Sequence, residues 1–174
     1  SLGGSHKVAF SYALKNGFSH VAVLHGDDQA DLSDLVPWLE DGRALDRDSF
    51  LGSRFHRSSR CVNYSWFRIL GNRIFNALVS LVAGRHLTDL GSGLNLYRTE
   101  YLAPGFYQEF PDNLNFNVYM LLYGVHCRSD FSFFPITWRE EDQVSNVRFL
   151  HQSLEILSVC RRYLFARQGL FRPS

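Results

Sequence analysis

Short apolar segments alternate with longer segments of helical periodicity along this chain. The strand-like segments are residues 20–24 (HVAVL), 49–55 (SFLGSRF), 88–98 (TDLGSGLNLYR, a glycine-rich turn and a strand) and 131–140 (FSFFPITWRE). The segments with helical patterns are residues 6–16, 31–42, 65–84, 115–125 and 146–169. Helices placed between strands in this order predict an α/β fold with a mainly parallel sheet, because each helix can return the chain to the starting edge.

The first helical segment also predicts which side chains face the core. Its pattern places Val8, Ala9, Tyr12 and Ala13 on one face, and Gly17 ends the helix.

The chain has 174 residues, of which 45% are hydrophobic, so it can bury one sizeable core. We therefore expect a single globular domain.

Charge and cysteine content exclude several classes of partner and site. The net charge is +1, which favours neither a nucleic acid nor an acidic partner. Residues 49–88 nevertheless contain six arginines and no acidic residue. The three cysteines lie far apart, without the closely spaced pairs of zinc sites, and predict reduced thiols in a cytoplasmic setting. The longest apolar run, near residues 75–84, is too short to cross a bilayer.

Oxygen ligands are concentrated directly after the first strand, in residues 25–31 (HGDDQAD). Ligands of open α/β sheets bind beyond the carboxyl ends of the strands, where this segment lies. If the segment is extended, His25, Asp27 and Gln29 project to one side, since side chains alternate with period two. An imidazole, a carboxylate and an amide would then converge on one hard divalent ion, together with phosphate oxygens of a substrate.

The aspartates of this segment also have a purely structural interpretation. Asp28, Asp31 and Asp34 can cap the helix that follows or lie in its first turn, where the helix dipole favours negative charge. We favour this interpretation for Asp31 and Asp34. It does not account for Asp27 and Gln29.

Taken in order, the segments HVAVLHGDDQAD, FLGSRF, FRILGN, TDLGSGLNLYR and PITWRE resemble the family 2 glycosyltransferases. The similarity is greatest to the branch of dolichyl- and polyprenyl-phosphate sugar transferases, and it implies a GT-A (Rossmann-like) fold. In that family a DxDxQ segment holds the metal that bridges the donor diphosphate. His25 stands in the place of the first aspartate, while Asp27 and Gln29 match the second and the glutamine. The resemblance implies Mn²⁺ or Mg²⁺ as cofactor, and imidazole tolerates Mn²⁺ better.

The resemblance also assigns roles in catalysis. Arg54 and Arg68 match positions that meet the acceptor phosphate and the donor diphosphate, and a guanidinium fork suits such oxygens. Asp89 matches the region of a general base in many family members. A phosphate acceptor is already ionised and needs no base, so Asp89 is equally well interpreted as a cap of its turn.

Further ligand contacts are implied by the resemblance, in which the segment DLGSGLNLYR is similar to the family's acceptor-side turn. Gly91 and Gly93 are expected to leave backbone amides free near an anion, and Ser92 to meet sugar hydroxyls. The segment WREEDQVSN resembles the one that closes over the donor, through Arg139 and Ser145. The remaining residues expected to contact the donor are Lys7 and Asp28.

The resemblance implies that the domain is incomplete. Family members begin with nucleotide-binding strands, whereas this sequence begins at the helix that carries Lys7, so residues 1–148 correspond to a partial GT-A domain. A sheet without its first strands exposes an unpaired edge, and we expect a homo-oligomer or coverage of that edge by a terminal segment. Residues 149–174 form a basic amphipathic helix whose Arg161, Arg162 and Arg167 could meet an anionic membrane surface, unless the helix packs on the domain.

The expected function is that of an inverting glycosyltransferase at the cytosolic face of a membrane. The partners would be a nucleotide-sugar donor and a lipid-phosphate acceptor. A first alternative is transfer to a saccharide hydroxyl, with Asp89 as base. A second is a degenerate GT-A domain that binds a partner without turnover.

Overall fold

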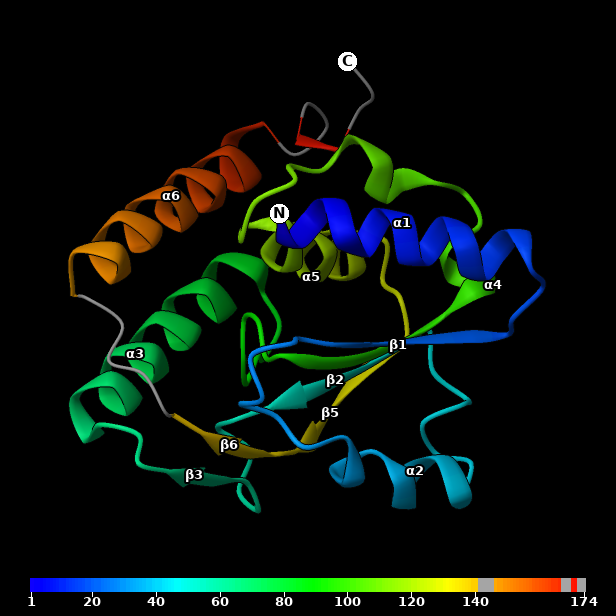
Figure 1. Ribbon diagram of the computed structural model, residues 1–174. Coiled ribbons are helices and arrows are strands. Elements are labelled where there is room, and N and C mark those ends of the chain that lie inside the picture. Colours follow the sequence, from blue (N-terminus) through cyan, green and yellow to red (C-terminus); the bar gives the residue numbers. More distant parts are fainter. Residues whose placement is uncertain (141–145, 167–169, 172–174) are drawn as a thin grey trace.

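The structure is a computed structural model that describes residues 1–140, 146–166 and 170–171 (Figure 1). The strands are β1 (His20–Leu24), β2 (Ser49–Ser53), β3 (Arg60–Val62), β4 (Leu94–Arg98), β5 (Phe131–Pro135) and β6 (Thr137–Arg139). The helices are α1 (Leu2–Lys15), α2 (Val36–Glu40), α3 (Trp66–Ala83), α4 (Thr99–Leu102), α5 (Phe116–His126) and α6 (Asn146–Phe165), with 3₁₀ turns η1 (Leu32–Asp34) and η2 (Phe106–Glu109). The mixed α/β class expected from the sequence is confirmed.

The sheet is not mainly parallel, so that prediction was wrong. Among the described residues the larger sheet has the order β1-β4-β2-β5, and β4 runs antiparallel to both β1 and β2. Only β2 and β5 pair in parallel within it. The short strands β3 and β6 form a separate parallel pair.

The direction of β4 follows from where the chain re-enters the sheet. Asp89 accepts hydrogen bonds from Arg54, which directly follows β2, and the carbonyl of Gly93 accepts one from the backbone N–H of His25, which directly follows β1. The connection after α3 is therefore held at the carboxyl ends of β1 and β2. Because β4 begins at that end, with Leu94 opposite Leu24, it must run in the opposite direction.

Two apolar clusters lie on opposite faces of the sheet. In Figure 1, α1 and α5 lie on one side of the sheet and α2 on the other. The larger cluster joins α1, α5, α3 and α6 to the sheet and includes Phe10 and Phe116, both fully buried. The smaller cluster joins Leu35, beside α2, to Phe50 and Phe134. The central strands β2 and β4 are buried on both faces. The apolar run of β1 is not explained in this way, because β1 is an edge strand in which Ala22 and Leu24 are exposed.

The buried face of α1 differs from the expected one. Ala13 is buried as expected, together with His6 and Phe10, whereas Val8 is 72% exposed and Tyr12 63% exposed. Gly3 also packs tightly, because an added Cβ would lie 2.6 Å from the carbonyl oxygen of Pro111. The helix is therefore rotated from the face that its apolar residues predicted, and it directs an imidazole into the interior.

Candidate functional site

A cavity of about 300 Å³ opens beside the carboxyl ends of β1 and β2. It lies between the sheet, α3 and the first turn of α5. The polar side chains that line it come from segments far apart in the sequence: His25, Gln29, Arg54, Tyr64, Arg68, Asn72, Asn76, Asn117, Glu140, Gln152 and Ser153. The connection after β2 thus brings Arg54 and Arg68, two of the six arginines of residues 49–88, into one cavity at the end of β1.

Arg54 is held in the cavity wall by Asp89. Its Nε and Nη2 donate to the two oxygens of the carboxylate at 2.8 and 2.7 Å, and its backbone N–H donates to the same group at 2.9 Å. The side chain of Asp89 is 0% exposed and that of Arg54 is 15% exposed. Burial alone would lower the pKa of the Arg54 guanidinium, but the charge of Asp89 raises that pKa above its ordinary value.

Arg68 forms the second ion pair of the cavity. Its Nη1 donates to Oε1 of Glu140, which follows β6, and both side chains are largely buried. One turn further along α3, Asn72 donates to the hydroxyl of Tyr64 at 2.9 Å. Each cavity arginine therefore faces a carboxylate as well as the open volume, so an anionic ligand would compete with Asp89 and Glu140.

The segment after β1 forms a turn and is not extended. Asp28 has a φ of 57°, in the left-handed region, and Oδ1 of Asp27 accepts the backbone N–H of Gln29 at 3.3 Å. Period-two alternation therefore does not describe this segment. His25 and Gln29 line the cavity, while Asp27 and Asp28 are exposed. The described part of the chain has no group of three or more His, Cys, Asp or Glu residues arranged to hold a metal.

His25, like Gln29, is partly buried in this turn. Its Nε2 is buried without a hydrogen-bond partner among the described residues. Burial lowers the pKa of its imidazole, the charge of Asp27 raises it, and that of Arg54 lowers it, so the net shift is downward. The ring is therefore held neutral near pH 7.

Several of the expected donor contacts lie away from the cavity. Lys7 donates to the carbonyl of Phe110 at 2.6 Å and pairs with Asp112 at 2.8 Å, which ties α1 to a loop. Ser92 is 1% exposed and donates to the carbonyl of Leu94 at 3.2 Å. Arg139 points outward beside Asp31 at 3.7 Å. Ser145 lies outside the described residues.

In the glycine-rich turn before β4, close packing explains Gly93, and the amide of Gly91 is not free for an anion. The amide of Gly91 donates to Asp89 Oδ1 at 3.2 Å. A Cβ added at Gly93 would lie 3.3 Å from both the His25 Cβ and the Trp138 ring. Neither glycine has a positive φ. The close approach of β1 and β6 therefore explains Gly93, and the expected free amide at Gly91 is used internally.

The structural interpretation of the later aspartates is confirmed for Asp31. Its carboxylate accepts the backbone N–H of Ser33 at 3.0 Å and caps the 3₁₀ turn η1. Asp34 lies at the end of that turn, where it accepts the backbone N–H of Thr137 and joins the turn to β6. Both acids are thus used by the fold.

Sequence reasoning missed Glu140, His6 and Asn117. Alternation along β6 places Trp138 and Glu140 on one side and Arg139 on the other, so the segment WRE contained the signal for Glu140. Trp138 supports the cavity wall, with its ring 5.1 Å from the Arg54 guanidinium. We found no comparable sequence signal for His6 or Asn117.

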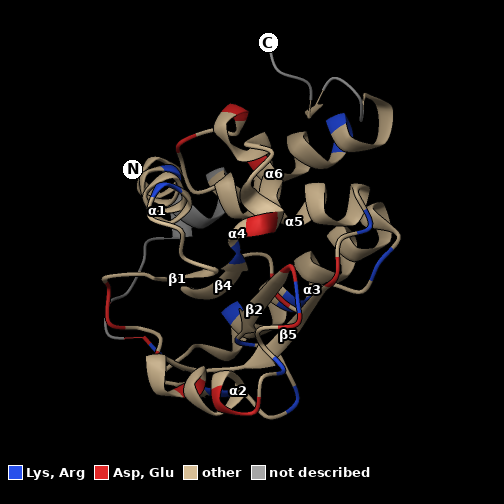
Figure 2. Cartoon of the chain, turned by 90° about the vertical axis from the view of Figure 1, so that its right-hand side faces the viewer, with Lys and Arg blue, Asp and Glu red and all other residues tan. Residues whose placement is uncertain are grey.

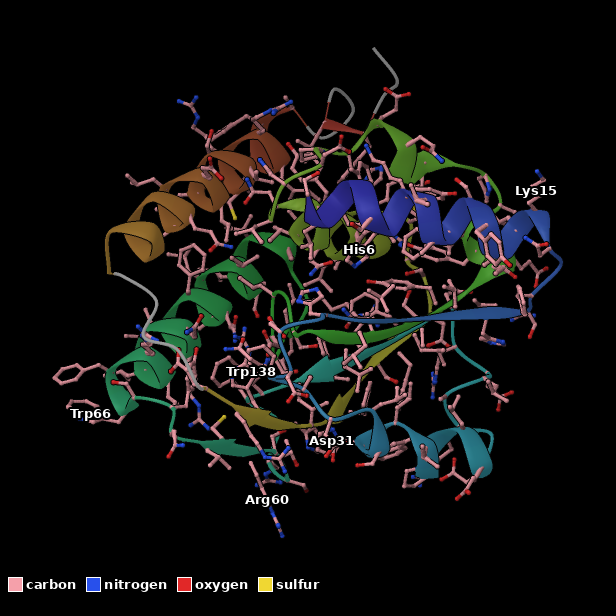
Figure 3. All side chains as sticks on the ribbon, in the orientation of Figure 1. His6, Lys15, Asp31, Arg60, Trp66 and Trp138 are labelled. Carbon is pink, nitrogen blue, oxygen red and sulfur yellow. The ribbon has the colours of Figure 1, made fainter. Side chains whose placement is uncertain are left out.

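The outer surface combines paired charges with exposed apolar side chains. On the side shown in Figure 2, acidic and basic segments lie near one another around α2 and β5, as in the Arg47–Asp130 pair at 2.6 Å. The exposed apolar residues of α3 are Trp66, Phe67, Leu70, Ile74, Leu78 and Leu81, and Trp66 points away from the molecule in Figure 3. Within the described ranges no helix is long and apolar enough to span a membrane.

The helix α6 packs on the domain and also leaves apolar residues exposed. Val159, Cys160 and Tyr163 are buried in the larger cluster. Leu164 is 48% exposed and Phe165 is 84% exposed. Arg167 lies outside the described residues. Packing on the domain is thus observed for one face, and the other face remains available.

Comparison with protein-family models finds no match, and comparison with curated proteins also finds none.

Proposed function

We propose that this chain is part of an inverting glycosyltransferase with a GT-A fold, which transfers a sugar from a nucleotide diphosphate donor to a polyprenyl-phosphate acceptor. The observation that carries the proposal is that Arg54 and Arg68, 14 residues apart, line one cavity at the carboxyl ends of β1 and β2. Guanidinium groups in a partly enclosed site suit phosphate oxygens, because charge-assisted hydrogen bonds strengthen where water is excluded.

The proposed roles of the two arginines follow from their contacts. Asp89 uses Nε and Nη2 of Arg54, so Nη1 is the guanidinium nitrogen that would meet a ligand oxygen. Arg68 would exchange Glu140 for the donor diphosphate. Charge neutralisation of the leaving diphosphate, together with positioning, then accounts for the catalysis that we propose.

A divalent ion, Mn²⁺ or Mg²⁺, would lie at His25, Asp27 and Gln29. His25 Nε2 lacks a protein partner among the described residues, and Gln29 lines the cavity. Of these three residues only Asp27 carries a carboxylate. They therefore fit a divalent ion only when phosphate oxygens complete the coordination shell of that ion. Such an ion would stabilise negative charge on the leaving group. Calorimetry should therefore show that Mn²⁺ raises donor affinity in the parent and not in Asp27→Ala.

The acceptor is proposed from two features of the structure. The hydrogen bonds from Arg54 and Gly91 occupy the Asp89 carboxylate, which makes this residue a poor general base and favours an acceptor that is already ionised. Exposed apolar residues on α3 and α6 provide area for peripheral contact with the cytosolic face of a membrane that carries such a lipid. Transfer to a saccharide hydroxyl remains the alternative for which Asp89 would be the base.

Transfer of a radiolabelled sugar tests the proposal. The chain is incubated with Mn²⁺ and a panel of labelled nucleotide-sugars, with polyprenyl phosphate or an oligosaccharide as acceptor. We expect label in the lipid fraction, lost in Arg68→Ala and retained in Arg73→Ala, which changes an exposed arginine of the same helix. Label in the oligosaccharide alone would favour the alternative acceptor. Donor binding without transfer to either acceptor would support a non-catalytic GT-A domain and contradict the proposal.

A further inference from the structure

Where α1, the end of β1 and α5 meet, three buried polar atoms have no hydrogen-bond partner within the described part of the chain. They are Nε2 of His6, Nε2 of His25 and Oδ1 of Asn117. His6 is only 2% exposed and Asn117 only 7% exposed. Buried polar atoms are nearly always paired, so three unpaired atoms in one region indicate a ligand.

The three residues converge from separate elements on the same turn. The rings of His6 and His25 have centroids 6.0 Å apart and planes at 83°. A Cβ added at Gly93 would touch His25 at 3.3 Å, and one added at Gly91 would touch Asn117 at 3.5 Å. Figure 3 shows His6 beneath α1, on the side that faces the sheet. Both His25 and Asn117 also line the 300 Å³ cavity.

The hydrogen bond of His6 fixes which ring nitrogen is available. Its Nδ1 lies 2.8 Å from the carbonyl oxygen of Leu2, and a carbonyl only accepts, so Nδ1 carries the proton. In the neutral ring Nε2 then holds a lone pair. This arrangement is the usual one for a metal-binding histidine, whose other nitrogen donates to a carbonyl.

The chemistry of the three atoms selects the kind of ligand. Neutral nitrogen lone pairs and an amide oxygen attract cations and repel anions, so phosphate does not suit them. Mg²⁺ prefers carboxylate, phosphate and water oxygens, whereas imidazole suits Zn²⁺, Co²⁺, Ni²⁺ and Cu²⁺. An ion at ~2.1 Å from each nitrogen lies about 3.2 Å from each ring centroid, so the observed centroid separation of 6.0 Å is within reach of one ion.

We propose that His6 and His25, with Asn117 as a third donor, bind a late transition-metal ion such as Zn²⁺ or Co²⁺. A remaining coordination position faces the cavity, where an oxygen of a cavity ligand can enter. The inference rests on the proposed function only in sharing His25 with the donor site. His25 Nε2 binds one ion at a time, so with the buried ion in place the donor ion would be held by Asp27, Gln29 and phosphate oxygens. Ion binding itself requires neither donor nor sugar transfer.

Metal titration of the intact chain tests this site. Calorimetry and the visible spectrum of Co²⁺ are measured for the parent, His6→Gln, His25→Gln and the control His126→Gln, which changes an exposed histidine at the end of α5. We expect one tight site in the parent, weakened about tenfold or more by either buried substitution and unchanged in the control. We also expect much weaker binding of Mg²⁺. Equal Zn²⁺ affinity in the parent and His6→Gln would overturn the proposal.

A gain-of-affinity variant keeps the test valid if a histidine variant fails to fold. Asn117→Asp retains the size of the side chain and replaces an amide oxygen by a charged one. It should tighten Zn²⁺ binding about tenfold, which is ~1.4 kcal/mol. An unchanged or lower affinity in folded Asn117→Asp would overturn the role of Asn117. These measurements contain no nucleotide-sugar, so their failure would leave the proposed transferase untouched, and absence of sugar transfer would leave the metal site untouched.

Discussion

Arg54 and Asp89 form a bidentate ion pair that joins the end of β2 to the loop before β4, with N–O distances of 2.7 and 2.8 Å. The backbone N–H of Arg54 adds a third hydrogen bond to the same carboxylate. The pair therefore holds the loop before β4 at the carboxyl end of β2 and positions a cavity arginine. Its removal should affect the fold as well as ligand binding.

We expect Asp89→Asn to lower the free energy of unfolding by about 3 kcal/mol, because it leaves the guanidinium of Arg54 buried without its counter-charge. Asp41→Asn is the matched control, since Asp41 pairs with Arg43 at an exposed position. Exposed pairs contribute little to stability, so the control should unfold at nearly the parental urea concentration. Equal urea midpoints for the two variants would show that the Arg54–Asp89 pair does not hold the fold.

Glu140→Gln should strengthen anion binding. The Glu140 carboxylate pairs with Arg68 inside the cavity and competes with an incoming diphosphate. Neutralising it should raise the affinity for inorganic pyrophosphate about tenfold, or ~1.4 kcal/mol, measured by calorimetry. Glu100→Gln, which removes the exposed partner of Arg98, is the control and should leave the affinity unchanged. A lower affinity in Glu140→Gln would mean that Glu140 positions Arg68 for the ligand.

Gly52→Ala should destabilise the sheet by roughly 1–3 kcal/mol, because small-to-large changes in packed regions force backbone shifts. The added Cβ would lie 2.5 Å from the carbonyl oxygen of Leu94 on the neighbouring strand. At Gly26 no atom of the residues that the structure describes lies within 4 Å of such a Cβ, so Gly26→Ala is the control. Thermal unfolding should show a clearly lower Tm for the first variant only. A parental Tm in Gly52→Ala would indicate that β2 and β4 are further apart.

The free energy of unfolding should fall above about pH 10, because two tyrosines are buried. Burial raises the pKa of the Tyr97 phenol above its ordinary value of 10.0 and does the same for Tyr101. A raised folded-state pKa means that the folded chain holds protons that the unfolded chain releases. Stability is therefore complete below about pH 10 and falls as the pH rises further, by at most about 1.4 kcal/mol per pH unit for each tyrosine.

Tyr97→Phe should reduce this alkaline loss, since phenylalanine has no proton to release. Urea unfolding at about pH 8 and about pH 11 measures the difference. Tyr12→Phe, at a position 63% exposed, should behave as the parent does. The same alkaline loss in all three proteins would show that Tyr97 is not the responsible group.

Most elements could be predicted from the sequence, because their patterns are local. The apolar run of β1 and the helix α3 lie within a residue or so of their expected positions. The direction of β4 could not be predicted, since it depends on the Arg54–Asp89 contact between residues 35 positions apart. The face of α1 was wrong because tertiary packing buries His6 and leaves Val8 in solvent.

The candidate site was predictable to a similar degree. Arg54 and Arg68 were expected near a ligand, and the structure places both in one cavity. The turn at Asp28 could not be read from HGDDQ, since alternation assumes an extended chain. The carboxylate partner Glu140 follows the three-residue strand β6, which pairs with β3 and forms a bridge to Ala30. The strand β3 was itself unexpected.

Calorimetric titration with a nucleoside diphosphate, beside the matching nucleoside, tests whether the cavity arginines bind a diphosphate. We predict that the diphosphate binds in the cavity and that the nucleoside binds far more weakly. Arg68→Lys should weaken diphosphate binding about tenfold, because the guanidinium fork is lost. Arg73→Lys, at an exposed position of the same helix, should bind as the parent does. Equal diphosphate affinity in Arg68→Lys and Arg73→Lys, or nucleoside binding as tight as that of the diphosphate, would contradict this prediction.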